Sequence, residues 1–248
     1  MSREMLNETT FTTLPAPPSP IDLGAQPRVM TVRGTVSRAG VLLALAVASA
    51  TLGWNNAGEI LSTANVVLLI GVFGLMALSV MTARRPQIAP VTGPVYAVVM
   101  GLWAGAISAL YEAAYPGIVL QAVFATFSVF LACLVLYVTR IVKVTDRFVF
   151  TVSVAGAGIA LMYLATWILS AFGIRMPFIN SPDPIGIAIS VGICIVAALF
   201  LFIDFRVIEE GAARQAPSYM EWYAAFGLMA TLIWIYFEVL RLIGKVRS

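Results

Sequence analysis

After about residue 33, the chain is a series of long hydrophobic runs separated by short polar breaks. Each run is close to the roughly 20 residues that a helix needs to cross the hydrocarbon core of a bilayer. Backbone groups in lipid must be hydrogen-bonded within their own segment, so helices are the only reasonable assignment. The runs are Val36–Trp54, Ile60–Met81, Val91–Tyr111, Tyr115–Val138, Phe148–Phe172, Pro184–Ile203 and Trp222–Ile243. The pattern predicts an all-α membrane protein with seven transmembrane helices.

The first residues have a different character from the rest of the chain. Residues 1–34 are polar and rich in proline, and they lack the apolar region that a signal peptide needs. We therefore expect residues 1–34 to form a flexible cytoplasmic tail with no function of its own. Residues 35–248 are expected to form the seven-helix transmembrane domain.

The overall composition excludes several classes of protein. Hydrophobic residues make up 60% of the chain and charged residues 11%, whereas soluble domains carry roughly a quarter charged residues. A soluble enzyme, a nucleic-acid-binding domain and a disordered protein are thereby excluded. The chain has no histidine, which removes imidazole metal sites and histidine-based catalysis. Cys133 and Cys194 lie inside apolar runs and are interpreted as small hydrophobic residues.

The lysines and arginines predict the orientation, because cytoplasmic loops are enriched in them. A cytoplasmic N-terminus places most of the 15 basic residues on the inside. The basic C-terminus is the exception, since seven spans would put Arg241, Lys245 and Arg247 outside. Either the last helix is an incomplete or re-entrant span, or the rule is broken there. The expected location is the cell membrane.

Acidic residues within apolar runs are candidates for function, because a charge in the membrane is costly unless it is paired or hydrated. Glu238 lies among apolar and aromatic residues for a full turn on either side. It could form an i,i+3 ion pair with Arg241, or it could face a polar cavity inside the bundle. The pattern favours neither.

Two other acids lie near the ends of predicted spans. Asp204 closes the sixth span, where it could simply mark the boundary of the membrane, with Arg206 to neutralise it. Glu112 lies at the tight junction of the third and fourth spans and could cap the short outer turn. Both alternatives are structural.

Considered together, Asp204 and Glu238 suggest a functional pair. Two carboxylates close together in a medium of low dielectric cannot both ionise cheaply, so the pair tends to share one proton. A deprotonated pair attracts cations, and its oxygen atoms suit calcium. Because two carboxylates are far fewer than the six to eight oxygen ligands of a tight calcium site, a transit site is the better interpretation.

Several short segments resemble the signature sequences of one family of membrane proteins. They are Gly105-Ala106-Ile107-Ser108, Tyr115-Pro116-Gly117, Ala122 with Thr126 and Phe130, Ile203–Ile208 and Tyr236–Leu242. Together they resemble the Bax inhibitor-1 family, and the likeness covers nearly everything after the tail. With Met220-Glu221-Trp222-Tyr223, the pattern is most similar to the bacterial subgroup that carries a proline-rich N-terminal extension.

The resemblance implies a seven-helix bundle with the last helix at its centre and a calcium leak gated by a pH-sensitive carboxylate pair. It assigns this pair to Asp204 and Glu238, and it implies an arginine partner, a role open to Arg206 or Arg241. Glu238 replaces the aspartate of the family. The separation along the chain is also long, so the pair can meet only if residues 219–226 lie along the membrane interface and the last span starts near Gly227.

Two further classes of function compete with the leak channel. The resemblance also associates bacterial relatives with regulation of a membrane-bound AAA protease, for which the tail would be the contact segment. An intramembrane aspartyl protease is disfavoured, because neither acid lies in a Gly-x-Gly-Asp sequence. We therefore expect no enzymatic activity and no cofactor, with the lipid bilayer, calcium ions and protons as the partners.

Overall fold

The computed structural model describes residues 29–248 except 63 and 173–180, and these residues form helices joined by short connections. Six helices are long and apolar enough to cross a membrane among the described residues, and α3 is a further helix of 21 residues. The chain is therefore a multi-pass helical membrane protein. The helices are α1 Val32–Asn55, α2 Ala57–Ser62, α3 Ala64–Arg84, η2 Pro86–Ile88, α4 Ala89–Ala114, α5 Ile118–Val138, α6 Asp146–Ala171, α8 Pro184–Ala213 and α9 Met220–Arg247.

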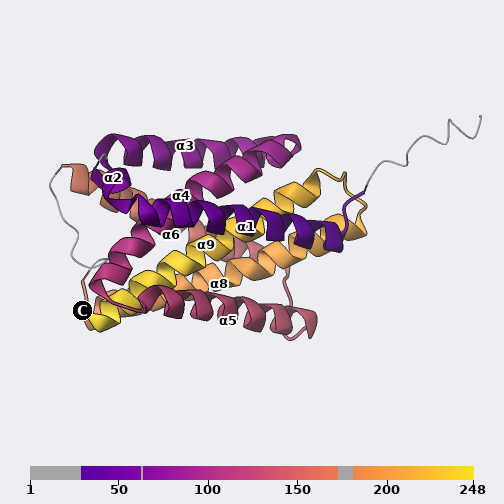
Figure 1. Cartoon of the computed structure of the whole chain (residues 1–248). Coiled ribbons are helices and arrows are strands. Elements are labelled where there is room, and N and C mark those ends of the chain that lie inside the picture. The colour runs from indigo at the N-terminus through magenta and orange to yellow at the C-terminus, as the bar shows by residue number, and fades with distance from the viewer. Residues whose placement is uncertain (1–28, 63, 173–180) are drawn as a thin grey trace, which may run out of the picture.

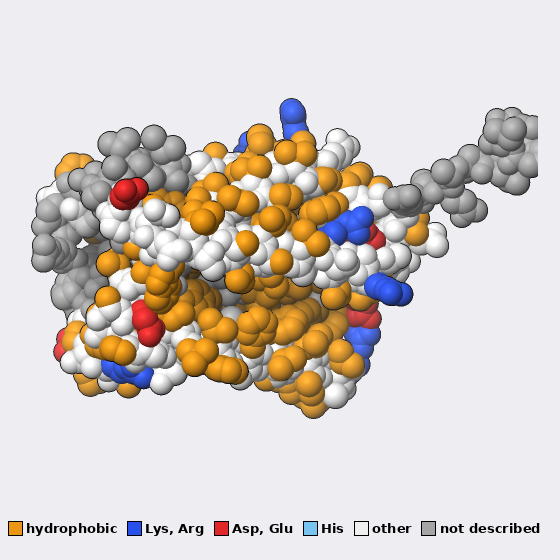
Figure 2. All heavy atoms as spheres, in the orientation of Figure 1, with side chains coloured by type: hydrophobic (Ala, Val, Ile, Leu, Met, Phe, Trp, Pro, Cys, Tyr) orange, Lys and Arg blue, Asp and Glu red, His pale blue; other side chains and the backbone are white. Residues whose placement is uncertain are grey.

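The long helices lie side by side and alternate in direction (Figure 1). The start of α1 and the α8–α9 loop meet at one end of the bundle, which we call the N-terminal end, and Ser248 lies at the other, the C-terminal end (Figure 1). On the face shown in Figure 2, charged side chains lie mostly towards these two ends and hydrophobic side chains fill the band between them. This banding is what a lipid environment requires.

Helix α9 contacts four of the other long helices, α1, α4, α5 and α8. A larger share of α9 is buried than of any other candidate span, whereas few residues of α6 are buried. Met229, Ile235 and Leu240 of α9 are fully enclosed. The side chains of α9 therefore supply much of the bundle interior.

Helices α1 and α4 pack closely because small residues face one another. A methyl group added at Gly101 would overlap the carbonyl oxygen of Ala46, and one added at Gly105 would overlap that of Ala50. These two glycines are four residues apart and therefore lie on one face of α4. Small residues at such spacing let two backbones approach, which is how membrane helices gain packing energy.

The predicted boundary of the tail is wrong. Residues 1–28 lie outside the described residues, but Val29 already pairs with Pro217, and Met30 donates its backbone N–H to the Ala216 oxygen at 2.7 Å. Helix α1 begins at Val32 because the Thr31 hydroxyl accepts the Gly34 N–H at 2.9 Å and caps it. The residues from 29 onwards thus belong to the helical domain.

The predicted runs correspond to the long helices, with two differences. The second run contains a short helix, α2, before α3. The sixth run continues as helix beyond Ile203 to Ala213, because its polar end is held by ion pairs instead of ending at the hydrophobic boundary. Asp204 therefore lies inside α8, nine residues before the helix ends at Ala213.

Candidate functional site

The candidate site lies along α8 and α9, which carry Asp204 and Glu238. The two helices are consecutive, antiparallel and in contact along their length. A loop of six residues, 214–219, joins them. Helix α9 runs unbroken from Met220 to Arg247. Residues 220–226 therefore belong to the same helix as Glu238 and do not form a separate segment before it.

Glu238 is enclosed in the bundle, with 1% of its surface exposed. Its Oε1 atom accepts hydrogen bonds from the Tyr163 hydroxyl at 2.7 Å and from the Trp234 indole N–H at 3.1 Å. Its Oε2 atom lies 3.5 Å from Nη1 of Arg241 and accepts no hydrogen bond. The carboxylate therefore has the i,i+3 ion pair with Arg241 that was one of the two sequence-based alternatives, together with two uncharged hydrogen-bond donors.

Arg241 joins this site to α6. Its Nη1 donates to the Tyr163 hydroxyl at 2.5 Å, and its guanidinium lies 4.9 Å from the centre of the Tyr163 ring. Tyr163 thus bridges the acid and the base, donating to Glu238 while it accepts from Arg241. This triad fixes α6 to α9 at a point where α6 has few other buried contacts.

Asp204 lies against α9 at a different level. Its Oδ1 atom faces Gly227, where an added methyl group would come within 3.3 Å, and its carboxylate also interacts with the Thr231 side chain. Its Oδ2 atom is buried and accepts no hydrogen bond from the described residues. No arginine or lysine is paired with it within the described part of the chain. A buried carboxylate without such a partner is uncommon and costly.

The structure does not bring Asp204 and Glu238 together. Asp204 is level with Gly227 and Thr231, and Thr231 precedes Glu238 by seven residues, or about 10 Å along a helix. No hydrogen bond or ion pair joins the two acids in the described ranges. The two carboxylates do not pair because α9 is a continuous helix, which places Glu238 about two turns beyond the residues that Asp204 contacts.

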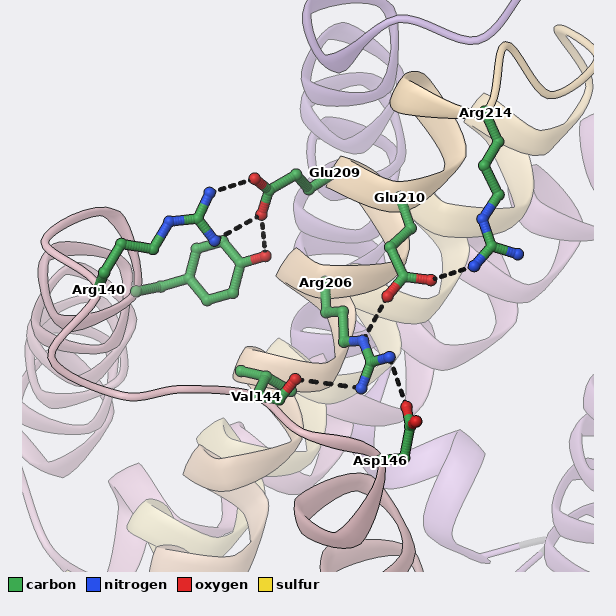
Figure 3. Close-up of polar contacts among 8 residues, drawn as sticks. Arg140, Val144, Asp146, Arg206, Glu209, Glu210 and Arg214 are labelled. Carbon is green, nitrogen blue, oxygen red and sulfur yellow. Dashed lines mark hydrogen bonds and ion pairs between the residues drawn. The ribbon is translucent and has the colours of Figure 1, made fainter.

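Arg206 contacts neither Asp204 nor Glu238 but other groups near the N-terminal end of the bundle (Figure 3). It contacts Glu210 at 2.5 Å, Asp146 at 2.6 Å and the Val144 carbonyl at 3.1 Å. These bonds attach the α5–α6 connection to the end of α8. Of the two candidates for the arginine partner, Arg241 is the one that contacts a carboxylate of the predicted pair.

A second polar group in Figure 3 attaches the end of α5 to α8. Arg140 contacts Glu209, with Nη1 donating to Oε2 at 3.2 Å, and the Tyr137 hydroxyl donates to the same carboxylate. The hydrogen bond to Glu209 holds the pKa of the Arg140 guanidinium above its ordinary value. This group is solvent-exposed and serves to position the loop.

Glu112 is a cap for the turn between α4 and α5. Its Oε1 accepts the Gly117 N–H at 2.6 Å and its Oε2 accepts the Val119 N–H at 3.1 Å. Gly117 has a φ of 82°, a left-handed conformation that favours glycine. These bonds satisfy N–H groups at the start of α5, which have no partner within the helix. The structural alternative for Glu112 is thus the one that its contacts fit.

The basic residues near the C-terminus have specific partners. Lys245 is buried and donates to the Gly186 carbonyl at 3.0 Å and the Ser190 hydroxyl at 2.8 Å. Arg247 donates to the Pro116 carbonyl and to Gln121. Because α9 is long enough to span, the last helix is not cut short. These cations bind the protein itself, which accounts for their position at an end where loop charges are otherwise few.

Glu221, at the start of the last hydrophobic run, is another buried acid, and its partners could not be predicted from the sequence. Glu221 accepts the Thr31 N–H at 2.8 Å and its hydroxyl at 2.9 Å, and it is paired with Arg38. The guanidinium of Arg38 also lies 5.5 Å from the ring centre of Trp222. The start of α9 is thereby held to the start of α1. An acid next to a tryptophan at a helix start was the available signal, but its partner Thr31 is 190 residues away along the chain.

Within the ranges described, no group of three or more acidic or cysteine side chains could hold a metal ion. Asp204 and Glu238 thus stand as single oxygen donors at separate levels. The site as built is two buried acids along one helix pair, one neutralised by Arg241 and one without a counter-charge.

These features define a helical-bundle membrane protein with ionisable side chains enclosed between its last helices. The sequence model of the family described as Bax inhibitor 1 like matches residues 3–248. The chain belongs to this family. No curated protein and no solved structure matches the chain.

Proposed function

We propose that this protein is a pH-sensitive leak channel for cations, with calcium as the permeant ion. In this proposal the chain forms a seven-helix bundle with α9 at its centre, in a bacterial cell membrane with the N-terminus in the cytoplasm. Membership of the Bax inhibitor 1 like family supports the proposal, as does the enclosure of two acids between α8 and α9.

The proposal depends on the surroundings of the Asp204 carboxylate within the described residues. Its Oδ2 atom is buried without a hydrogen-bond partner. An ionised carboxylate in such a place is costly unless a positive charge reaches it. A proton or a passing cation can each supply that charge, and the two compete for the same oxygen atoms. Competition of this kind makes cation passage depend on pH without any histidine.

Glu238 has a different role in the proposal. Its negative charge is already balanced by Arg241, and Tyr163 holds both groups in place. An ion can use the Glu238 carboxylate only when Arg241 moves away, so the triad acts as a latch. Because the two acids lie at different levels, the ion meets them one after the other. Two single carboxylates suit brief passage and not storage.

Calcium flux into liposomes at several pH values tests the proposal. Asp204→Asn and Glu238→Gln should each lower the flux at neutral pH by about tenfold or more, because each removes a charge-assisted contact to the ion. Both should flatten its pH dependence. Asp146→Asn is the matched control, since the Asp146 side chain is 92% exposed. Flux and pH profile like those of the unaltered protein in both variants would refute the proposal.

A further inference from the structure

A lateral groove with a volume of about 500 Å³ opens between α1, α4, α5 and α9. Ala46 and Ala50 of α1 form one wall, Val123 of α5 the opposite wall, and Leu232 of α9 lies at the back. In Figure 2 the face between α1 and α5 is covered by hydrophobic side chains. Because the chain spans a membrane, this face is turned towards lipid.

The tight contact of α1 with α4 closes the groove on the side between these two helices. Gly101 and Gly105 both line the groove, and both lie directly against the backbone of α1. The two helices leave no room for a side chain between them there. The groove is therefore a slot in the surface and not a passage through the bundle.

Two polar side chains that line the groove, Ser108 and Tyr236, are bonded to each other. The Ser108 hydroxyl lies 2.6 Å from the Ala104 carbonyl, to which it donates, and 2.6 Å from the Tyr236 hydroxyl. With the Ser108 proton given to Ala104, the Tyr236 hydroxyl donates to Ser108, so both protons are used internally. An occupant of this part of the groove finds only apolar surface, which favours a hydrocarbon over an ion or a polar ligand.

The length of the groove matches one leaflet of a bilayer. Its lining on α1 extends from Leu43 to Asn55, which is about 18 Å of helix. One half of the hydrocarbon core is about 15 Å thick. The groove ends at Trp54 and Asn55, where α1 itself ends, and tryptophan is typical of the membrane interface. A chain that starts at this interface can follow the groove towards the bilayer centre.

We propose that this groove binds an acyl chain of a membrane lipid from the leaflet at the C-terminal end of the bundle. A helix from a second copy fits less well. A helix of that length and about 10 Å wide occupies roughly 1,400 Å³, nearly three times the volume of the groove. The proposal does not depend on ion conduction, since the slot is separate from Asp204 and Glu238.

The test uses the full chain reconstituted with a phospholipid that carries a diazirine on its acyl chain. After irradiation, the labelled peptides are identified by mass spectrometry. Labels should concentrate on the groove-lining residues of α1, α4 and α5. Labels spread evenly over all lipid-facing helices would indicate ordinary surrounding lipid and would overturn the proposal. Cross-links between two copies at the groove would overturn it too.

Two substitutions on α5 sharpen the result. Val123→Phe fills the groove and should reduce labelling of the groove residues at least fivefold. Val135→Phe places the same side chain at a position that is 58% exposed and outside the groove, and it should leave the labelling unchanged. An equal loss in both variants, or no loss in Val123→Phe, would refute the proposal. If Val123→Phe does not fold, the distribution of labels on the unaltered chain tests the proposal instead.

Discussion

Replacement of Arg241 by leucine should destabilise the protein because it leaves the Glu238 carboxylate buried without a counter-charge. Breaking a buried ion pair from one side costs about 3–5 kcal/mol. The Arg241 side chain is 26% exposed, so the lower end of this range, about 3 kcal/mol, applies. At an effective dielectric constant of about 20, the 3.5 Å separation corresponds to an attraction of about 5 kcal/mol, which is consistent with a cost of this size.

The loss of stability comes from the buried negative charge of Glu238, so removing that charge should restore part of the stability. In Arg241→Leu/Glu238→Gln the amide oxygen can still accept from Tyr163 and Trp234, and about 2 kcal/mol should be regained. Arg214→Leu is the control, since Arg214 is 78% exposed in its pair with Glu210. It should cost less than about 1 kcal/mol.

Unfolding by sodium dodecyl sulfate in mixed micelles, followed by far-ultraviolet circular dichroism, measures these differences. A cost of 3 kcal/mol changes the folding equilibrium constant by roughly 150-fold, which such titrations resolve. Equal destabilisation by Arg241→Leu and Arg214→Leu would refute the reasoning. So would a double variant that is no more stable than Arg241→Leu.

Three further predictions concern the contact of α4 with α1 and the residues that precede α1. Gly105→Val should destabilise the protein by about 1–3 kcal/mol, because the new side chain overlaps the Ala50 carbonyl and separates α1 from α4. The same denaturant titration measures this loss. An unchanged midpoint would contradict the close packing of the two helices. Deletion of residues 1–28 should leave stability and calcium flux unchanged but abolish any regulation of a membrane AAA protease, measured as protease activity in co-reconstituted vesicles. Deletion of residues 1–31 should also destabilise the protein, because it removes the donors to Glu221; equal stability of the two deletions would contradict this.

The helices themselves could be predicted because lipid imposes a simple rule on the sequence. Any stretch that crosses the hydrocarbon core must be apolar and must satisfy its own backbone, so the runs along the chain indicate the spans directly. The boundaries were less certain where polar side chains extend a helix. Helix α8 continues to Ala213 because Arg206 and Glu210 hold its end to the α5–α6 connection, a contact between residues 60 positions apart.

The candidate site could be predicted only in part. Glu238 and Arg241 are three residues apart, so helical spacing alone suggested their pairing. The groups that complete the site, Tyr163 and Trp234, could be suspected only as polar atoms within apolar spans. Tyr163 lies 75 residues from Glu238, and nothing local specifies which helix α6 faces.

The amino-acid pattern is enough to show that the chain lies in a lipid bilayer, that it is helical, and that a few acids stand where a charge is costly. Which of these acids has a counter-charge follows from the folded arrangement. Arg241 contacts Glu238 and Arg38 contacts Glu221, while Arg206 contacts Glu210 and Asp204 is left without a counter-charge among the described residues. The physical reason is that hydrophobicity is a property of each segment alone, whereas charge compensation depends on the register and rotation of helices that meet only after folding.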